Sequence, residues 1–391
     1  MKAHSLYLHI PFCTHRCGYC DFNTYAGLEH QMPAYVDALV VEVEWVAAKA
    51  PTRIPVHTVF FGGGTPSLLP AEAIARILDA IRSGFDLATD AEVSLEANPG
   101  SLRPGYLAAL RAAGVNRLSL GVQSASPEEL RLLERQHVYE DVIAAVRMAR
   151  EEGFDNLNLD LIFALPGQSL AAWQRNLELA LELHPEHFSL YALTIEHGTP
   201  FQKMADRGLL LLVDPDLAAD MYEWAMQRLD EAGHEQYEIS NWAQRRDGQL
   251  LAGRHNLQYW RNLPYFGLGA GAHGFVGGYR TVNALAPTAY IERLAGAAQP
   301  LYPRTPATIK AQPVDAPLEM GETMMMGLRL LEEGVSQSGF AERFGRTLDE
   351  VYGPQIAELQ ANGLLENGGD RLRLTARGQL LGNRVFQEFL P

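Results

Sequence analysis

The feature that most limits how this chain can fold is a regular alternation of short apolar runs with longer stretches of helical periodicity. The apolar runs predict β-strands at residues 5–10, 56–61, 92–96, 117–121, 157–163 and 187–193. The segments between them predict helices at residues 33–49, 70–83, 104–113, 127–134, 139–152 and 170–183. Strands that alternate with helices form βα units and a parallel sheet. We therefore expect an α/β fold with an incomplete (β/α)6 barrel, and a doubly wound sheet is the competing architecture.

The alternation ends near residue 215, and the rest of the chain divides into shorter regions. We expect the barrel to span residues 1–215 and a barrel-completing region to span 216–298, with a helix at 215–232. Residues 299–317 contain five prolines with little periodicity, which predicts a linker or an extended crossing. Residues 318–391 predict a smaller, mostly helical domain with helices at 318–331 and 336–363. A strand–turn–strand pattern around residues 367–369 and a last helix make this domain winged-helix-like.

The net charge of −15 weighs against nucleic acid or an anionic membrane surface as a partner. No run of 18 apolar residues is present, so we expect no transmembrane segment. Cysteines that must stay reduced to bind metal favour the cytoplasm. We therefore expect a cytoplasmic protein that reaches the inner membrane only through a partner.

All three cysteines of the chain, Cys13, Cys17 and Cys20, lie in one C-x3-C-x2-C segment directly after the first predicted strand. A structural zinc ion takes four protein ligands, and a self-contained [4Fe–4S] cluster takes four cysteines. Three thiolates therefore predict a cluster that leaves one iron open to another ligand. Three unrelated buried or redox-active cysteines are the alternative interpretation.

A glycine-rich turn follows the second predicted strand, with the sequence GGGTP at residues 62–66. Glycines let the backbone approach a ligand closely, in conformations that other residues avoid. The turn lacks the Gly-Lys-Ser/Thr ending of a phosphate-binding P-loop and does not match G-x-G-x-x-G. Taken alone, it is interpreted more simply as a tight structural turn.

The cysteine loop and the glycine turn together resemble the radical S-adenosylmethionine (radical SAM) superfamily. This resemblance implies that Cys13, Cys17 and Cys20 hold a [4Fe–4S] cluster and that S-adenosylmethionine chelates the fourth iron. It also implies that Tyr19, just before the third cysteine, lies near the adenine; packing is the alternative role of this side chain.

The segments LYLHIPFC, FFGGGTPS, EANPG, LSLGVQS, LNLDLIFALPGQ and FGLGAGAHG together resemble the anaerobic coproporphyrinogen III oxidase branch of that superfamily. Members of this branch can bind one or two cofactor molecules side by side. The resemblance implies contacts to the first cofactor from Tyr7, Gly63, Glu96 and His273. It implies contacts to the second from Gly64, Thr65, Gln123, Arg135 and Asp160. A charged residue at a strand end is also a common solvated rim residue, which is the alternative for each charged position.

Two features distinguish members of this branch. Oxidase members carry a fourth cysteine two positions after the third, where this chain has Phe22, and a long extension before the first, where this chain has twelve residues. Residues 255–260 read HNLQYW and resemble the HNxxYW motif of a haem-chaperone group that lacks the oxidase activity. The resemblance implies that the chain binds haem and passes it to acceptor proteins such as respiratory enzymes. A homodimer is among the assemblies we expect.

His255 is the candidate haem ligand, because a histidine can bind haem iron axially while Tyr and Trp offer flat faces to a macrocycle. In the alternative interpretation, His255 and Asn256 satisfy buried backbone groups, and Tyr259 and Trp260 fill the core. A methionine run at residues 324–326 is interpreted as core filler rather than as a source of haem ligands.

Two other functions stay open. The complete cofactor apparatus suits an enzyme that performs radical chemistry on a tetrapyrrole, either an oxygen-independent coproporphyrinogen III oxidase or a methyltransferase that uses the second cofactor. A scaffold with a purely structural cluster is the third hypothesis, and the glycine turn and Arg135 argue against it. Whether the chain is an enzyme is left open, although Phe22 disfavours the oxidase reaction.

Overall fold

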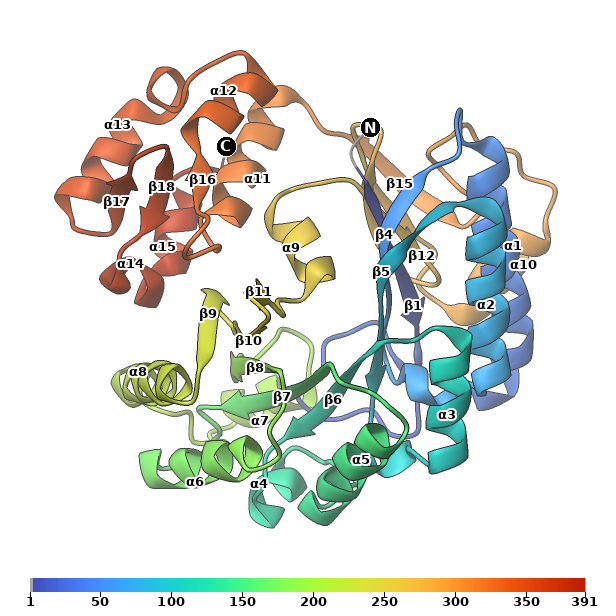
Figure 1. Ribbon diagram of the computed structural model, residues 1–391, viewed down its shortest axis with the longest axis horizontal. Coiled ribbons are helices and arrows are strands. Elements are labelled where there is room, and N and C mark those ends of the chain that lie inside the picture. The colour runs from blue at the N-terminus through green and yellow to red at the C-terminus, as the bar shows by residue number, and fades with distance from the viewer. Residues whose placement is uncertain (1–2, 391) are drawn as a thin grey trace.

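One large, mostly parallel sheet organises most of the molecule (Figure 1). The computed structural model describes residues 3–390. The central strands pair in the order β8-β7-β6-β5-β4-β1-β12, and all of these pairings are parallel. These strands are β1 (His4–Ile10), β4 (Pro55–Gly63), β5 (Asp86–Ala97), β6 (Arg117–Gln123), β7 (Leu157–Phe163), β8 (His187–Ala192) and β12 (Tyr265–Leu268).

The strand order identifies the architecture. From β1 to β8 each strand pairs with the next parallel strand along the chain, so the order never reverses. A doubly wound sheet reverses its order at a switch point, which excludes that alternative. The edge strands of the sheet do not pair with each other within the described residues, so the barrel stays open. The prediction of an incomplete barrel is confirmed.

Helices cover the outer face of the curved sheet (Figure 1). Helix α2 shows why they form there: Ile74, Ile77, Leu78 and Ile81 recur at helical spacing and are all fully buried. Its outward face carries the charged residues of the segment. The helices that follow the parallel strands are α1 (Met32–Lys49), α2 (Ala71–Gly84), α3 (Pro104–Ala113), α4 (Pro127–Leu132), α5 (Tyr139–Glu151) and α6 (Leu170–Leu181).

Antiparallel strands extend the sheet at both edges. Beyond β12 lie β13 (His273–Val276), β14 (Tyr279–Asn283) and β15 (Thr308–Pro313), and beyond β8 lie β9 (His234–Glu238), β10 (Asn241–Arg246) and β11 (Gln249–Leu250). Strand β15 falls inside the proline-rich segment 299–317, so part of that segment crosses the molecule in an extended conformation. Strand β12 is not among the predicted strands, because its four residues are followed at once by a glycine-rich stretch.

The C-terminal region forms a second core around a small sheet of β16 (Val335–Ser336), β17 (Leu365–Gly368) and β18 (Arg371–Leu374). Its helices are α11 (Ala316–Gly327), α12 (Gln337–Phe344), α13 (Leu348–Ala361), α14 (Ala376–Leu380) and α15 (Gly382–Gln387). The helix character predicted at 336–363 is divided between two helices, because Gly345 ends α12 with a φ of +69°. Thr347 then caps α13 by accepting a hydrogen bond from the Glu350 N–H. The expected helix-rich C-terminal domain is present.

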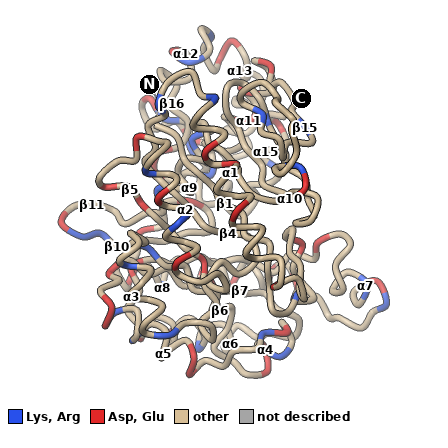
Figure 2. The backbone as a smooth tube through the Cα atoms, turned by 90° about the vertical axis from the view of Figure 1, so that its right-hand side faces the viewer, with Lys and Arg blue, Asp and Glu red and all other residues tan. Residues whose placement is uncertain are grey.

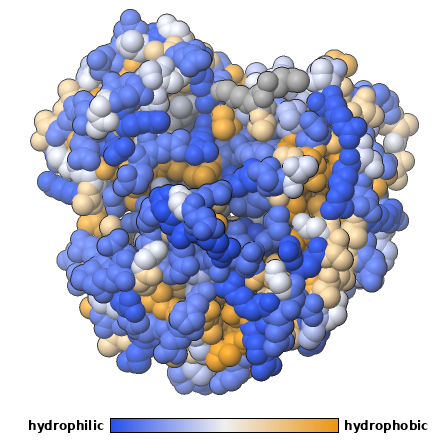
Figure 3. Space-filling model, viewed as in Figure 1, coloured by the Kyte–Doolittle hydropathy of each residue, from blue (hydrophilic) through white to orange (hydrophobic). Residues whose placement is uncertain are grey.

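Other helices link these parts: α7 (Pro200–Asp206), α8 (Pro215–Glu231), α9 (Arg254–Trp260) and α10 (Pro287–Ala295). Helix α9 lies between the barrel and the C-terminal domain, whereas α7 projects from the edge of the molecule (Figures 1 and 2). Basic and acidic residues are interspersed along the backbone (Figure 2). The face shown in Figure 3 is mostly hydrophilic, with apolar side chains visible between the C-terminal domain and the barrel. In residues 3–390 no helix is long and apolar enough to cross a membrane.

Candidate functional site

The three cysteines lie on one loop that follows β1, at the C-terminal end of the parallel strands. Short strands β2 (Phe12–Cys13) and β3 (Tyr25–Ala26) pair and hold the two ends of this loop together. The Cys20 N–H donates to the Cys17 carbonyl over 3.1 Å, which tightens the turn between these two residues. Burial, and to a lesser degree repulsion from neighbouring thiolates, raises the pKa of Cys13 and of Cys20. This mutual repulsion reflects the short separations of the three sulfurs.

The donor set fits an iron–sulfur cluster better than a single metal ion. Within the described residues, no group of three His, Cys, Asp or Glu side chains converges on one ion position. In a cluster each thiolate binds a different iron, so convergence on one point is not needed. Thiols whose pKa is raised by burial need a strong cation to stay ionised, and iron supplies it. The chain has no fourth cysteine, which leaves one iron without a cysteine ligand.

The glycine turn packs directly against the cysteine loop. The N–H groups of Gly64 and Thr65 donate to the carbonyls of Ile10 and Phe12, each over 2.8 Å. A side chain on Gly64 would lie 2.6 Å from the Phe12 carbonyl and 3.1 Å from the Cys13 sulfur. The Thr65 hydroxyl lies 3.6 Å from the same sulfur. Glycine is therefore required because two backbones meet beside a cluster ligand.

Tyr7, His9, Gly63 and Glu96 meet beside the glycine turn. The Gly63 N–H donates to Glu96 Oε2 over 2.9 Å, and the Tyr7 hydroxyl lies 2.9 Å from His9 Nδ1. Burial, and secondly the neighbouring Asp160 carboxylate, raises the pKa of Glu96 to about 8. The expected contacts of the first cofactor thus share one location at the ends of β1, β4 and β5. A buried carboxylate of this kind accepts hydrogen bonds from hydroxyl or ammonium groups.

Of the residues expected at a second cofactor, Gln123 ends β6, Asp160 lies within β7 and Arg135 follows α4. The other two, Gly64 and Thr65, belong to the glycine turn after β4. Asp160 accepts hydrogen bonds from Ser119 over 2.9 Å and from Asn158 over 2.8 Å, yet burial raises its pKa. Arg135 donates to the Gly121 carbonyl over 3.0 Å, and its buried Nε has no partner within the described residues. Gln123 has a φ of +65°, an uncommon conformation for a residue with a side chain. These groups border the cysteine loop through Arg135, whose charge acts on Cys13.

Tyr19 is part of the cysteine loop itself, whereas His273 comes from β13, beyond β12 in the sheet. Tyr19 packs edge-on against Phe201 of α7, with ring centroids 6.2 Å apart, and Arg135 lies beside its hydroxyl. His273 is exposed at the start of β13. Burial lowers the pKa of His9, and the charge of His273 adds to this effect. Burial, and secondly the Lys310 charge, lowers the pKa of His273. Tyr19 therefore lies at the cluster ligands, and His273 is related to them through His9.

His255 lies behind this site and is enclosed. Its Nδ1 lies 2.8 Å from the Thr58 hydroxyl and its Nε2 lies 2.9 Å from the Tyr259 hydroxyl. Its ring stacks on Phe60 at 5.0 Å, and only 2% of the residue is exposed. Burial lowers its pKa to about 3. Haem iron could reach this histidine only after these contacts were broken.

A network that sequence patterns do not reveal supports the end of the cysteine loop. Asn23 donates to the Ala270 carbonyl over 3.1 Å, and its own carbonyl accepts from His9 over 2.9 Å. The Tyr35 hydroxyl donates to the His9 carbonyl over 2.7 Å and accepts from the Ala270 N–H over 2.8 Å. One residue of the sequence does indicate buried polar contacts in this region. Glu42 is a single charged residue on the apolar face of α1, and the same face contains Tyr35.

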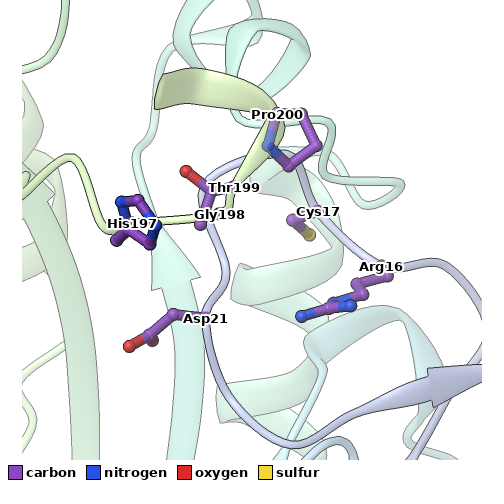
Figure 4. Close-up of a pocket in the computed structure, with 7 residues that line it drawn as sticks. All are labelled: Arg16, Cys17, Asp21, His197, Gly198, Thr199 and Pro200. Carbon is purple, nitrogen blue, oxygen red and sulfur yellow. The ribbon is translucent and has the colours of Figure 1, made fainter. Parts of the chain in front are cut away.

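A pocket of about 330 Å³ opens beside the cysteine loop (Figure 4). One wall comes from the loop itself and the other from the segment that leads into α7. The lining residues are Arg16, Cys17, Asp21, His197, Gly198, Thr199 and Pro200. No sequence pattern assigns a role to this segment, because His197 stands in no recognisable motif.

Comparison with known proteins identifies the family. The sequence pattern of the radical SAM superfamily matches residues 7–180, and that of the HemN C-terminal domain matches residues 314–381. A Bacillus subtilis protein named Heme chaperone HemW is 40% identical over 388 residues, which cover 99% of each chain. The chain belongs to the HemW family of radical SAM proteins. A Mycobacterium tuberculosis (strain CDC 1551 / Oshkosh) protein with the same name is 43% identical, covering 98% of this chain and 94% of that one.

The solved structure of coproporphyrinogen III oxidase (HemN) from Escherichia coli, a radical SAM enzyme, superposes with a TM-score of 0.82 at 25% identity. The match covers 99% of this chain and 90% of that chain. For a HemW-family chain, the superfamily implies a [4Fe–4S] cluster and S-adenosylmethionine. The geometry described above offers three thiolates and a glycine turn for them.

Proposed function

We propose that this protein is a haem chaperone, which binds haem and transfers it to acceptor proteins such as respiratory enzymes. The observation that carries the proposal is the match over 99% of both chains to a relative named Heme chaperone HemW. Phe22 supports it, because this exposed phenylalanine stands where oxidase members of the branch have a cysteine. We place the protein in the cytoplasm, with any contact to the inner membrane made by the acceptor.

Within this proposal Cys13, Cys17 and Cys20 hold a [4Fe–4S] cluster, and S-adenosylmethionine binds the open iron. The cluster and its cofactor supply one-electron chemistry when both are present. Gly63 and Glu96 then offer a backbone carbonyl and a carboxylate to the amino and hydroxyl groups of the first cofactor. The neighbouring Gly64 keeps side-chain atoms out of this space.

The remaining expected contacts form the second half of the same proposal. Arg135 has a buried Nε–H, unpaired within the described residues, that suits a carboxylate, and Asp160 offers acceptor atoms. These residues would receive a second molecule of S-adenosylmethionine. Their position around one loop supports a shared site for two cofactors.

A second candidate function is radical chemistry on a tetrapyrrole. The superposition on coproporphyrinogen III oxidase and the complete set of cofactor residues favour it. A protein that only carried haem would have no evident use for such a site. The reaction would be a coproporphyrinogen decarboxylation or a methyl transfer.

Haem titration of the full-length protein, with and without its cluster, tests the chaperone function. We expect a Soret band that saturates at a fixed haem-to-protein ratio. After a haem-free respiratory acceptor is added and the two proteins are separated, we expect the Soret band on the acceptor and no longer on this protein. A protein that shows no saturable Soret band would contradict the proposal.

Two assays separate the candidates. Cluster-loaded protein with reductant, S-adenosylmethionine and coproporphyrinogen III should give no protoporphyrinogen, and product formation would favour the enzyme. Cys17→Ala should abolish the visible absorbance of the cluster. An unchanged [4Fe–4S] spectrum in that variant would contradict the ligand assignment.

A further inference from the structure

The structure raises the question of where haem binds, because His255 is enclosed by its hydrogen bonds. His9 and His187 are likewise buried with both ring nitrogens in hydrogen bonds. His137 and His234 each bond a carbonyl through one nitrogen and bury the other. A haem that is loaded and released from solvent needs a histidine nitrogen that solvent can reach.

Only a few histidines meet this requirement in the described residues. His15 is exposed, but its Nε2 lies 2.9 Å from the Glu134 carboxylate. His30, His184, His197 and His273 are also exposed, and none of these four has a hydrogen bond to its ring within residues 3–390. His197 alone among these four lines the pocket beside the cysteine loop. The combination of a free imidazole and a cavity therefore occurs at His197.

The pocket also carries a partner for the charged edge of haem. Arg16 lies across the pocket from His197 in Figure 4 and makes no hydrogen bond to any residue from 3 to 390. A free guanidinium can hold a carboxylate through two parallel hydrogen bonds. Haem has its iron at the centre of the macrocycle and two propionates on one edge, so His197 can bind the iron while Arg16 binds a propionate of the same ligand.

The size of the pocket suits a ligand that is held only for a time. Ligand sites span roughly 300–1,000 Å³, so a pocket of about 330 Å³ would enclose only part of a macrocycle. Phe22 follows the lining residue Asp21 in the chain and is 63% exposed. The rest of the macrocycle would stay in solvent, where an acceptor can reach it.

We propose that the pocket between the cysteine loop and α7 is the haem site, with His197 as the iron ligand and Arg16 as the propionate ligand. This inference rests on the proposed chaperone function and adds a location to it. Since Cys17 lines the same pocket, haem bound there lies beside the cluster. The site is separate from the glycine turn and from Glu96.

Titration of ferric haem into the full-length, cluster-loaded protein tests the site. We expect His197→Ala to raise the dissociation constant at least about tenfold and to change the Soret maximum, while the cluster absorbance stays unchanged. Added imidazole should restore the original spectrum, which a merely structural role would not allow. His30→Ala is the matched control, because it removes another exposed histidine and should bind like the wild type.

Haem dimethyl ester separates the two contacts. We expect Arg16→Gln to weaken the binding of haem but not that of the ester, in which the carboxylates are blocked. His197→Ala should weaken both ligands.

The outcomes distinguish this site from the function itself. Wild-type protein that binds no haem would contradict the chaperone function and the site together. Wild-type binding that survives in His197→Ala would overturn the site alone. Loss of the Soret band in His273→Ala with His197→Ala unaffected would move the iron to His273 and also overturn the site.

Discussion

Glu96 is a carboxylate whose ionisation the barrel opposes, because burial and Asp160 raise its pKa from the usual 4.5 to about 8. The folded state therefore favours the neutral form, and this contribution to stability is lost as pH rises from 4.5 towards 8. Glu96→Gln stays neutral at every pH. Between pH 4.5 and about 8 the wild type loses stability, whereas the variant does not. We therefore expect the free energy of unfolding of the variant, relative to that of the wild type, to rise by on the order of a few kcal/mol over this range and to stay constant above it. Urea unfolding at a series of pH values measures the difference.

The same substitution should weaken the cofactor site. In our proposal Glu96 accepts a hydrogen bond from the ammonium group of S-adenosylmethionine, and a hydrogen bond to a charged group contributes about 1.5–3 kcal/mol. We therefore expect at least about tenfold weaker cofactor binding to cluster-loaded Glu96→Gln in equilibrium dialysis. Glu128→Gln is the control, since Glu128 is exposed and paired only with nearby surface groups. Equal affinity in both variants would remove Glu96 from the site.

Gly63 is the residue at which the backbone conformation matters most. Its φ is +113°, and a Cβ there would collide with the His9 ring. We expect Gly63→Ala to lower the free energy of unfolding by about 2–4 kcal/mol and to displace His9 from Tyr7. Gly105→Ala is the matched control, because a Cβ on this residue would meet nothing within 4 Å. Gly105 is in α3, where alanine should add up to about 1 kcal/mol of stability. Similar effects of both substitutions in urea unfolding would contradict this prediction.

Helix α9 carries the HNxxYW motif and connects the barrel strands to the C-terminal domain. The Glu92 carboxylate accepts from the Arg254 and His255 N–H groups over 3.0 and 3.1 Å, which fixes the start of the helix. The Gln258 Oε1 lies 3.0 Å from His57 Nε2. The Arg329 guanidinium stacks on the Trp260 ring, 4.4 Å from the ring centroid. The motif thus packs against both the barrel and the C-terminal domain and connects their two cores.

His255→Phe tests that role of the motif. The substitution keeps the stack on Phe60 but removes the hydrogen bonds of His255 to the Tyr259 and Thr58 hydroxyls, of which Thr58 keeps its bond to Ser5. We expect a loss of about 2–3 kcal/mol at neutral pH. The pKa of His255 is lowered from 6.5 to about 3. Its contribution to stability is therefore present above pH 6.5 and is lost as pH falls towards 3, so the difference between variant and wild type should shrink over that range. Urea unfolding at several pH values measures it.

Haem titration of the same variant tests whether His255 is the haem ligand instead. We expect the Soret band of folded His255→Phe to match that of the wild type, because its iron ligand lies elsewhere. A variant of unchanged stability that no longer shows the Soret band would identify His255 as the haem ligand.

The elements that sequence patterns could predict are those with a strong local period. The six parallel strands and the ends that carry Gly63 and Glu96 follow from apolar runs and turns. Strand β12 has only four residues and forms because β1 offers a free edge, which no local pattern reveals. Strand β15 likewise forms by pairing with β14, although it ends at Pro313 in a proline-rich segment. Such elements depend on long-range partners.

The side chains of the candidate site also divide into those that local motifs predict and those whose contacts depend on long-range partners. Motifs could point to Cys13 and Arg135, but not to the bonds that occupy both nitrogens of His255. Glu42 is a clear case: its two oxygens accept from Gly269 N–H, Tyr290, Asn283 and Thr305, and these donors lie more than 200 positions away in the chain. Hydrogen-bond partners at that separation cannot be read from spacing.

At the scale of the whole molecule, the C-terminal domain is attached to the barrel by charged groups at the end of α9. Arg261 pairs with Glu333 over 2.7 Å, and Arg343 donates to the Asn262 carbonyl over 2.8 Å. Most of these contacts are partly exposed and contribute little individually. The pair between Glu238 of β9 and Arg329 is different, because Glu238 is fully buried.

Arg329→Met should therefore disturb the junction between the two domains. Arg329 lies 3.6 Å from the Glu238 carboxylate, so its removal leaves this buried carboxylate with the Asn241 side chain but without a cation and should cost about 3–5 kcal/mol. Adding Glu238→Gln removes that charge, and we expect the double variant to recover part of the loss. Arg76→Ala breaks an exposed pair with Asp37 and should cost less than about 1 kcal/mol.

Urea unfolding gives these differences, and limited proteolysis between β15 and α11 reports whether the domains separate. In the single variant we expect faster cleavage there. If Glu238→Gln fails to recover stability in the Arg329→Met background, the stack of Arg329 on Trp260 rather than the buried ion pair holds the two domains together.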